Sequence, residues 1–328
     1  MKTPVIILLV VSTFISCGPT RNLSFEVMHP VSLNLPDPDG KYLVLNSSYL
    51  PDSIRDPANY ISYLTSEDKI IVDTIIIKNI FDGLYSVLYE SPVTGLNNAE
   101  YLEIRGSDTT GFMSPLSPIA VSEICLDYNT DYLISFEYYS FDLEYNLHSG
   151  SQLETLELQS KLLWRIYSKD GKLIDDYLSK DTYHWNYPEE LYLDQNNVYT
   201  NNLNFIREAF WIAGAKYAKR LSPYWENVDR LIYQIREKTD SDNNPISLDK
   251  NRLQICSKLE NKTKAYKACY NMSVLYESEG DIINALIWID RALGKKRNVF
   301  VRQYHEVLLN RQKTIEILNK QTGQKNQK

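Results

Sequence analysis

The chain has 328 residues, of which 43% are hydrophobic and 23% are charged. This composition is typical of a folded globular protein and excludes a largely disordered one. The formal net charge of −7 repels phosphate backbones, so nucleic acid is not expected as a partner. At roughly 150 residues per domain, the length predicts about two domains.

Residues 1–16 have the parts of a secretory signal. Lys2 gives a positive start, residues 5–15 are predominantly apolar, and the small residue Ser16 stands directly before Cys17. The apolar run is too short for a bilayer span, which needs ~20 residues. The junction resembles the lipobox of bacterial lipoproteins, which implies removal of the signal and acylation of Cys17 as a membrane anchor. An ordinary cleaved signal is the alternative.

Residues 17–40 are predicted to be the acylated cysteine and a tether, because prolines recur there without an apolar period. No cluster of Lys and Arg follows the anchor in the sequence, so membrane contact is expected from the lipid alone. The first strand is predicted over 41–45. A helix is expected over 77–88 from the spacing of its apolar residues, with Asp73 and Thr74 as candidate caps.

The next segments predict a β-α-β unit, a hairpin and a closing helix and strand. Ser117 before Pro118 marks a helix start, and the turn at Asp170 and Gly171 suits a tight hairpin. The predicted order is a strand at 101–104, a helix at 118–126, strands at 132–138, 162–167 and from 173 onward, a helix at 203–220 and a strand at 225–233. This predicts an N-terminal α/β domain, a mixed sheet with packed helices, over residues 41–238.

A polar segment at 239–245 marks a domain boundary, and the sequence after it is helical in pattern. We predict an all-α domain over 246–320 and a polar tail over 321–328. The predicted fold class is therefore α+β. Within the all-α domain, residues 266–293 have the strongest internal pattern.

This pattern consists of small residues and a turn. Gly280 fits a turn between two helices, and the packing positions are Ala268, Ala285 and Ala292. Residues 266–293 therefore closely resemble a tetratricopeptide repeat, with an ordinary helical hairpin as the alternative. Small side chains at these positions allow two helices to approach closely. A single repeat cannot bury its own faces, so helices at 248–259 and 300–318 are expected as neighbours.

The sequence predicts no catalytic residue, no metal site and no cofactor. Its histidines, which are His29, His148, His184 and His305, are scattered without metal-ligand spacing. The doublets Asp175–Asp176 and Glu189–Glu190 are expected to point to opposite faces of a strand, which excludes them as acid/base pairs. Cys256 and Cys269 are interpreted as buried thiols, with a disulfide between them as the alternative.

Three further segments are distinctive: Phe-Glu-Val-Met-His-Pro at 25–30, Ala-Gly-Ala-Lys-Tyr-Ala at 213–218 and Tyr-Asn-Met at 270–272. With these segments, the whole chain is similar to an uncharacterised family of Bacteroidota lipoproteins with an N-terminal α/β domain and C-terminal tetratricopeptide-like helices. In such lipoproteins an acidic run after the acylated cysteine accompanies surface display, and residues 18–22 have none. The resemblance therefore implies the periplasmic face of the outer membrane.

Together these features predict a lipid-anchored adaptor or scaffold that binds a protein or peptide of the cell envelope. The concave surface of the repeat helices is expected to make the contact, with Tyr270, Asn271 and Leu275 as candidate binding residues. One alternative is an envelope hydrolase with its site in the α/β domain. The other is a structural assembly subunit that forms homo-oligomers.

Overall fold

The computed structural model describes residues 20–35, 37, 39–49, 66–106, 114–147, 154–187, 202–235 and 248–321. The predicted signal, Cys17 and residues 322–328 lie outside this part. Two compact units are formed: one runs from Val31 to Tyr224, and the other combines the described residues up to Pro30 with those from Trp225 onward. The fold is α+β as predicted, with a mixed sheet followed by an all-helical region.

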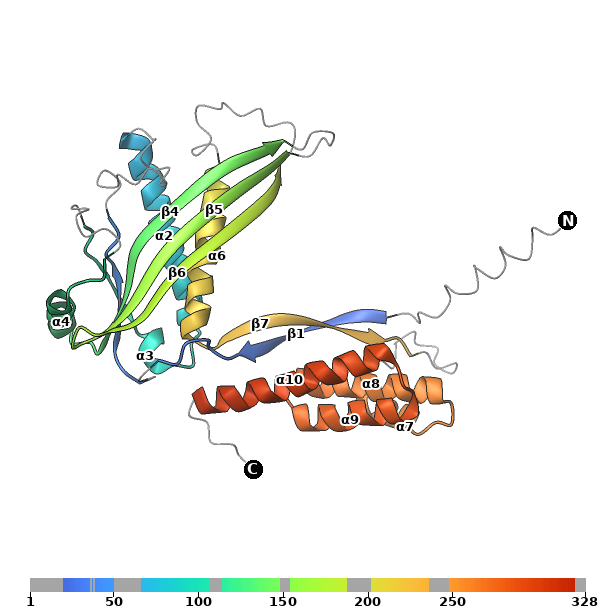
Figure 1. Ribbon diagram of the computed structural model, residues 1–328. Helices are drawn as coiled ribbons and strands as arrows, with labels where there is room; N and C mark the ends of the chain where they lie inside the picture. The colour runs from blue at the N-terminus through green and yellow to red at the C-terminus, as the bar shows by residue number, and fades with distance from the viewer. Residues whose placement is uncertain are drawn as a thin grey trace. The chain divides into compact units, whose positions relative to one another are not determined.

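The unit from Val31 to Tyr224 is built on a five-stranded sheet with the order β3-β2-β4-β5-β6 (Figure 1). Its strands are β2 (Tyr42–Asn46), β3 (Glu100–Glu103), β4 (Tyr132–Leu147), β5 (Glu154–Ser168) and β6 (Leu173–Tyr187). Strand β2 pairs in parallel with both β3 and β4, whereas β4, β5 and β6 are antiparallel. After β2 the chain adds the edge strand β3 on one side of it and then β4 on the other side.

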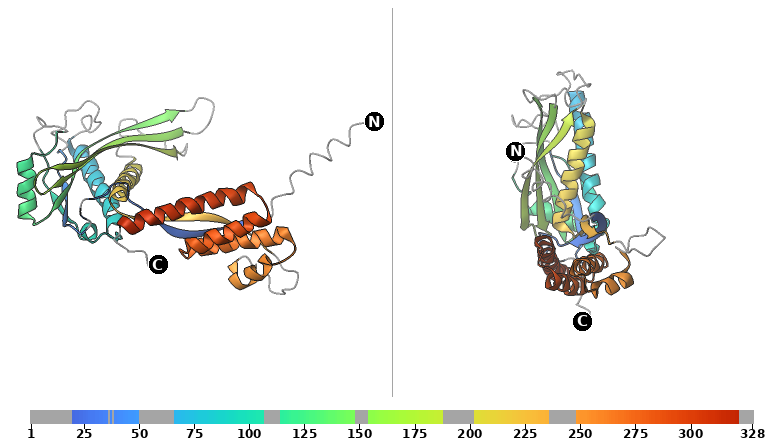
Figure 2. Two further views of the ribbon diagram at one scale, coloured as in Figure 1. Left: turned by 60° about the horizontal axis from the view of Figure 1, so that its bottom comes forward. Right: turned by 90° about the vertical axis from the view of Figure 1, so that its right-hand side faces the viewer.

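Helices cover both faces of this sheet. α2 (Ser66–Leu88) and α6 (Leu203–Leu221) pack on one face, α4 (Pro118–Asp127) packs on the other, and the short α3 (Thr94–Asn97) precedes β3 (Figure 2). Val44 of β2 joins the core beneath α2 and α6, while Leu43 and Leu45 join the core beneath α4. Because both of its faces are covered, β2 is buried along its whole length.

Two glycines allow α2 and α6 to cross in backbone contact. A Cβ atom on Gly83 would lie 2.0 Å from the carbonyl oxygen of Trp211, and one on Gly214 would lie 1.9 Å from that of Ile80. No side chain fits at such distances, so each position requires glycine. This explains the small residues around Gly214 in the segment 213–218.

Helix α2 begins earlier than its apolar spacing predicted. It starts at Ser66, so Asp73 and Thr74 lie inside the helix and the prediction that they cap it was wrong. The Thr74 hydroxyl donates to the carbonyl of Ile70 at 2.7 Å, a common arrangement within helices. By contrast, Ser117 caps α4 as predicted, accepting from the backbone N–H of Ala120 at 3.2 Å.

The second unit combines a two-stranded ribbon with four helices. The ribbon pairs β1 (Thr20–His29) with β7 (Tyr224–Tyr233), and the helices are α7 (Lys250–Ser257), α8 (Lys262–Ser278), α9 (Ile282–Lys295) and α10 (Val299–Gln321). Residues 20–29 were predicted to be tether, which was wrong, because Leu23, Phe25 and Val27 alternate as in a strand and bury one face. The strand predicted at 225–233 is present as β7, but it belongs to the second unit and not to the unit of the five-stranded sheet.

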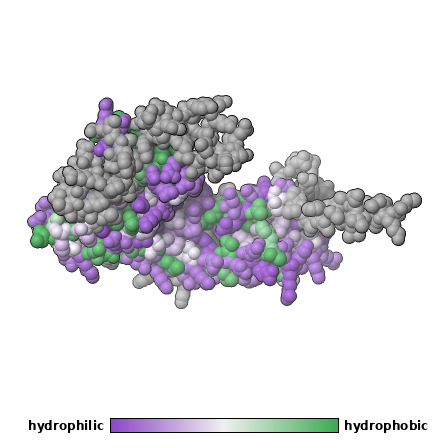
Figure 3. Space-filling view, turned by 45° about the horizontal axis from the view of Figure 1, so that its top comes forward, coloured by the Kyte–Doolittle hydropathy of each residue, from purple (hydrophilic) through white to green (hydrophobic). Residues whose placement is uncertain are grey.

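The hairpin of α8 and α9 is closely packed. Gly280 adopts a positive φ of 80° in the turn, and Asp281 caps α9 by accepting from the backbone N–H of Asn284 at 3.0 Å. The hydroxyl of Ser273 donates to the carbonyl of Ala285 at 2.7 Å across the helix crossing. Ala268, Ala285 and Ala292 are fully buried. None of the described helices combines the length and apolarity that a membrane span needs. In the view of Figure 3, hydrophilic residues cover much of the described surface, with hydrophobic residues scattered among them.

Candidate functional site

Three carboxylates are buried among the described residues, those of Asp73, Glu137 and Glu277. Each forms an ion pair with an arginine and accepts a hydrogen bond from a tyrosine hydroxyl. A buried charge is costly unless it is paired and hydrogen-bonded, and this shared arrangement satisfies that requirement.

The first cluster joins α2 to the carboxyl ends of β2 and β3. Arg105, just after β3, binds Asp73 through both terminal nitrogens, and it donates to the carbonyls of Ser48 at 3.3 Å and Tyr49 at 2.7 Å. The hydroxyl of Tyr139 on β4 donates to the same carboxylate. Burial, followed by the Asp73 charge, raises the pKa of Tyr139.

The second cluster lies on β4 and β5. The guanidinium of Arg165 pairs with Glu137 and, at 3.2 Å, with Asp176, while the Tyr167 hydroxyl donates to Glu137 at 2.6 Å. Burial raises the pKa of Glu137, although its bonds to Tyr167 and Arg165 oppose that effect. The neighbouring Asp175 binds Arg220 instead, at 2.9 and 3.0 Å, which agrees with the prediction that the two carboxylates point to opposite faces of the strand. Glu189 and Glu190 lie outside the described residues.

The third cluster joins the ribbon to the helices. Arg230 of β7 makes a bidentate pair with Glu277 of α8, at 2.9 Å from Nε and 2.8 Å from Nη2. The hydroxyl of Tyr304 on α10 donates to the same carboxylate at 2.6 Å. In all three clusters the carboxylate links side chains that come from different helices, strands or loops. The buried charge therefore has a structural role.

The predicted binding residues lie mostly inside the second unit. The Oδ1 atom of Asn271 accepts from the backbone N–H of Tyr233 at 2.9 Å, and its Nδ2 donates to the carbonyl of Tyr233 at 2.8 Å. The ring of Tyr270 packs 5.0 Å from that of Tyr304, and Leu275 is half-buried against the same core. The prediction that Tyr270 and Asn271 face a partner was wrong, because β7 occupies that face of α8.

A cavity of 370 Å³ lies between α2 and the edge strand β3, and its lining extends from Tyr85, beside the start of the strand, to Arg105, just after its end. The Arg105 end lies at the carboxyl ends of the parallel strands, where ligands of open α/β sheets commonly bind. It is lined by Asp73, Thr74, Ile77, Lys78, Phe81, Asp82, Tyr85, Tyr101, Glu103 and Arg105. The rings of Phe81 and Tyr101 meet edge to face at 4.8 Å, and the Tyr101 hydroxyl donates to Glu103 at 2.8 Å. Aromatic walls with a few charged groups suit a small polar ligand.

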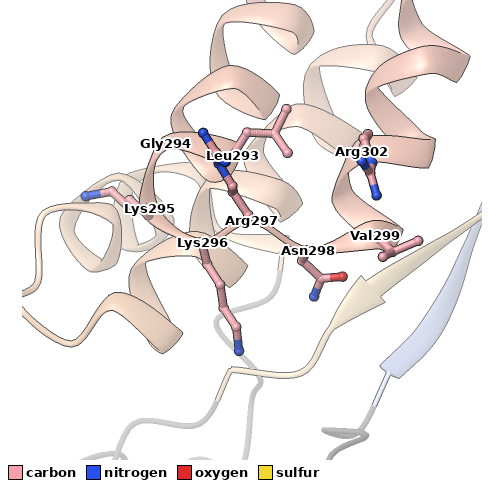
Figure 4. A pocket seen from close by; sticks show the side chains of 8 residues that line it. All are labelled: Leu293, Gly294, Lys295, Lys296, Arg297, Asn298, Val299 and Arg302. Atoms are coloured by element: carbon pink, nitrogen blue, oxygen red, sulfur yellow. The ribbon is translucent and has the colours of Figure 1, made fainter.

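A second hollow, of 730 Å³, lies at the turn between α9 and α10 (Figure 4). Its lining residues are Leu293, Gly294, Lys295, Lys296, Arg297, Asn298, Val299 and Arg302. Four of these are cationic and none is acidic. Figure 4 shows the basic side chains spreading outward from the turn. The side-chain oxygen of Asn298 accepts from the N–H of Phe300 at 2.9 Å and so begins α10. The sequence carries this signal as the Lys-Lys-Arg run at 295–297, which was not predicted to be a site.

The remaining candidates are dispersed in the described chain. His29 lies beside Glu226, His184 beside Glu157 and His305 beside Asp290, at 3.1, 3.5 and 3.2 Å, and His148 lies outside the described residues. No group of side chains suited to hold a metal ion occurs among the residues that the structure describes. Cys125, Cys256 and Cys269 are buried thiols. Burial raises the pKa of Cys125 and of Cys269.

Comparison with protein families identifies one match. The family described as Domain of unknown function (DUF8603) matches residues 43–233, more than half of the chain. The chain belongs to this family. The DUF8603 match runs from β2 to β7 and contains the Asp73 and Glu137 clusters and the 370 Å³ cavity, whereas α7 to α10 lie beyond it. No curated protein matches the chain.

Proposed function

We propose that this DUF8603 protein is a lipid-anchored envelope lipoprotein, held at the periplasmic face of the outer membrane by Cys17, that acts as a binding adaptor. Three observations support this proposal. The sequence before Cys17 has the lipobox pattern. The buried carboxylates of the described residues are committed to structural pairs, and α8 and α9 form a helical hairpin over the segment whose sequence resembles a tetratricopeptide repeat.

The adaptor surface that we propose is the outer side of α9, and one observation carries it. Ribbon strand β7 covers α8, whereas Ile283 and Ile287 of α9 stay 70% and 42% exposed. These two residues are one helical turn apart and share a face, opposite the buried Ala285 and Ile289. A partner protein with a complementary apolar surface would cover them.

Site-specific photo-crosslinking in cells tests this surface. A photoreactive residue at Ile283 is expected to capture one defined envelope protein, identified by mass spectrometry. The product should disappear when Ile287→Asp is added, while the circular dichroism of the purified chain stays unchanged. The control position is Ile119 on α4, which is 71% exposed. If the products join only two copies of this chain, the adaptor hypothesis is refuted in favour of a homo-oligomer. If Ile283 gives the same products as Ile119, both hypotheses are refuted.

A second candidate function is binding of a small molecule by the DUF8603 domain, with an envelope hydrolase as its catalytic form. The observation that favours it is the cavity between α2 and β3, where Tyr101 and Glu103 face the Asp73–Arg105 pair. Native mass spectrometry of protein isolated from its own envelope tests this candidate. A small-molecule adduct that is present on the wild type and lost in Glu103→Gln supports it, and the same adduct on both proteins, or no adduct on either, contradicts it.

A further inference from the structure

The basic hollow at the α9–α10 turn stands out against the charge of the chain. The whole protein carries a net charge of −7, yet Lys295, Lys296, Arg297 and Arg302 line one hollow with no acidic residue among its lining. Arginine and lysine side chains in such an arrangement suit phosphate groups. Val299, which is 60% exposed in the same lining, adds an apolar side chain beside the cations.

The first described residues of the chain lie at this same end of the unit. Strand β1 runs antiparallel to β7 (Figure 1), and the contacts of Ser24 with Asp229 and of His29 with Glu226 fix their alignment. This alignment places Thr20, where β1 starts, toward Tyr233, where β7 ends.

Tyr233 in turn lies close to the basic turn. Its ring is 6.2 Å from that of Phe300, the residue after Val299, and 5.7 Å from that of Tyr266. The Nζ atom of Lys296 lies 5.1 Å from the Tyr266 ring centre. The Nζ atom of Lys267 adds another cation, 5.0 Å from the ring of Tyr233. The amino end of β1 and the basic hollow therefore belong to one end of the same unit.

Cys17 precedes Thr20 by three residues. Three residues of extended chain span roughly 10 Å at most. An acyl chain on Cys17 would thus hold the membrane within reach of the cations at this end. Membrane contact was predicted from the lipid alone because no basic cluster follows Cys17 in sequence, whereas the cations at this end belong to residues 267–302.

We propose that the basic hollow binds the phosphates of anionic lipid headgroups in the membrane that anchors Cys17. The inference rests on the proposed anchor. Stable membrane attachment commonly combines acylation with a basic patch, because the patch gains electrostatic attraction near an anionic surface. The contact would orient the helical unit on the membrane and leave α9 available to a partner.

The test uses the acylated protein reconstituted in vesicles. Val299→Cys is labelled with an environment-sensitive fluorophore, since the other described thiols are buried. A blue shift is expected in vesicles that contain phosphatidylglycerol and not in vesicles of phosphatidylcholine. Replacing Lys295, Lys296 and Arg297 by Gln should lower the ratio of membrane-contacting to water-exposed fluorophore at least about tenfold. The charge-matched control replaces Lys161, Lys172 and Lys180, exposed residues of the other unit, by Gln.

The outcomes separate this inference from the proposed function. Equal emission in both vesicle types, or an equal loss in the control variant, would overturn headgroup binding even if the protein is acylated. Inorganic phosphate that abolishes the shift at millimolar concentration would assign the hollow to free phosphate instead. Failure of the chain to be acylated would refute the anchor. In that case the unacylated chain should still sediment with phosphatidylglycerol vesicles if the hollow binds headgroups, and absence of sedimentation would overturn the inference.

Discussion

The side-chain amide of Asn271 on α8 hydrogen-bonds both backbone groups of Tyr233 on β7, at 2.9 and 2.8 Å. An amide placed in this way pairs with the strand as a neighbouring strand would. It satisfies an N–H and a carbonyl that are buried in the unit. This contact fixes β7 against the helices and closes the face of α8 that the sequence predicted to be open.

Replacing Asn271 with Ala is expected to destabilise the helical unit. Two buried backbone groups of Tyr233 would lose their partners, at a cost of about 2–4 kcal/mol. Urea denaturation followed by circular dichroism measures the change. The control is Asn204→Ala on the exposed surface of α6, which should cost under about 0.5 kcal/mol. Equal midpoints for the two variants would show that the amide bonds contribute nothing to stability.

The elements that the sequence predicted well have local signals. The cap at Ser117, the hairpin turn at Gly171 and the turn at Gly280 depend on neighbouring residues, and the structure has these turns where they were expected. Such signals are set by backbone sterics and nearby hydrogen bonds, which a short segment determines by itself.

The features that the sequence did not reveal depend on distant pairs. Arg105 meets Asp73 across 32 positions, and Ser24 meets Asp229 across 205. Periodicity within a segment carries no information on such partners, so the ribbon of β1 and β7 and the buried ion pairs were missed. The alternation of Leu23, Phe25 and Val27 was a readable strand signal, but the prolines around it favoured a tether.

The Glu277 cluster is expected to be strongly coupled. Arg230→Met would leave a buried carboxylate without its cation, which costs about 3–5 kcal/mol. The double variant Arg230→Met with Glu277→Leu should lose less than the sum of the two single variants, because it leaves no unpaired charge. Urea denaturation of the four proteins completes the cycle. The exposed pair of Lys78 and Asp82 serves as the control, where Lys78→Met should cost under about 1 kcal/mol. Additive losses at Glu277 would contradict this coupling.

Two Gly→Ala substitutions should have opposite effects. Gly214→Ala places a methyl group against the backbone of Ile80, so α2 and α6 must move apart, and we expect a loss of at least about 2 kcal/mol. Gly294→Ala near the end of α9 meets nothing within 4 Å and should stabilise by about 0.5–1 kcal/mol. Thermal unfolding of both variants measures the contrast. A neutral Gly214→Ala would show that the close helix crossing is not needed for stability.

Last, the cap at Asp281 should make the stability of the helical unit depend on pH. The pKa of Asp281 lies below its ordinary value of 3.8, because its carboxylate accepts from the side chain of Asn284 and from the backbone N–H of the same residue. A depressed folded-state pKa means that the stabilisation is present above the unfolded pKa and is lost as the pH falls through the folded pKa.

Asp281→Ala should therefore cost about 1 kcal/mol at pH 7, and this cost should shrink as the pH falls below 3.8. Asp281→Asn keeps an oxygen acceptor but does not titrate, so it should stay close to the wild type at pH 7 and gain on it in acid. Urea midpoints of the three proteins at pH 7 and pH 3 measure these differences. A deficit of Asp281→Ala that is the same at both pH values would show that the ionised carboxylate does not stabilise the start of α9.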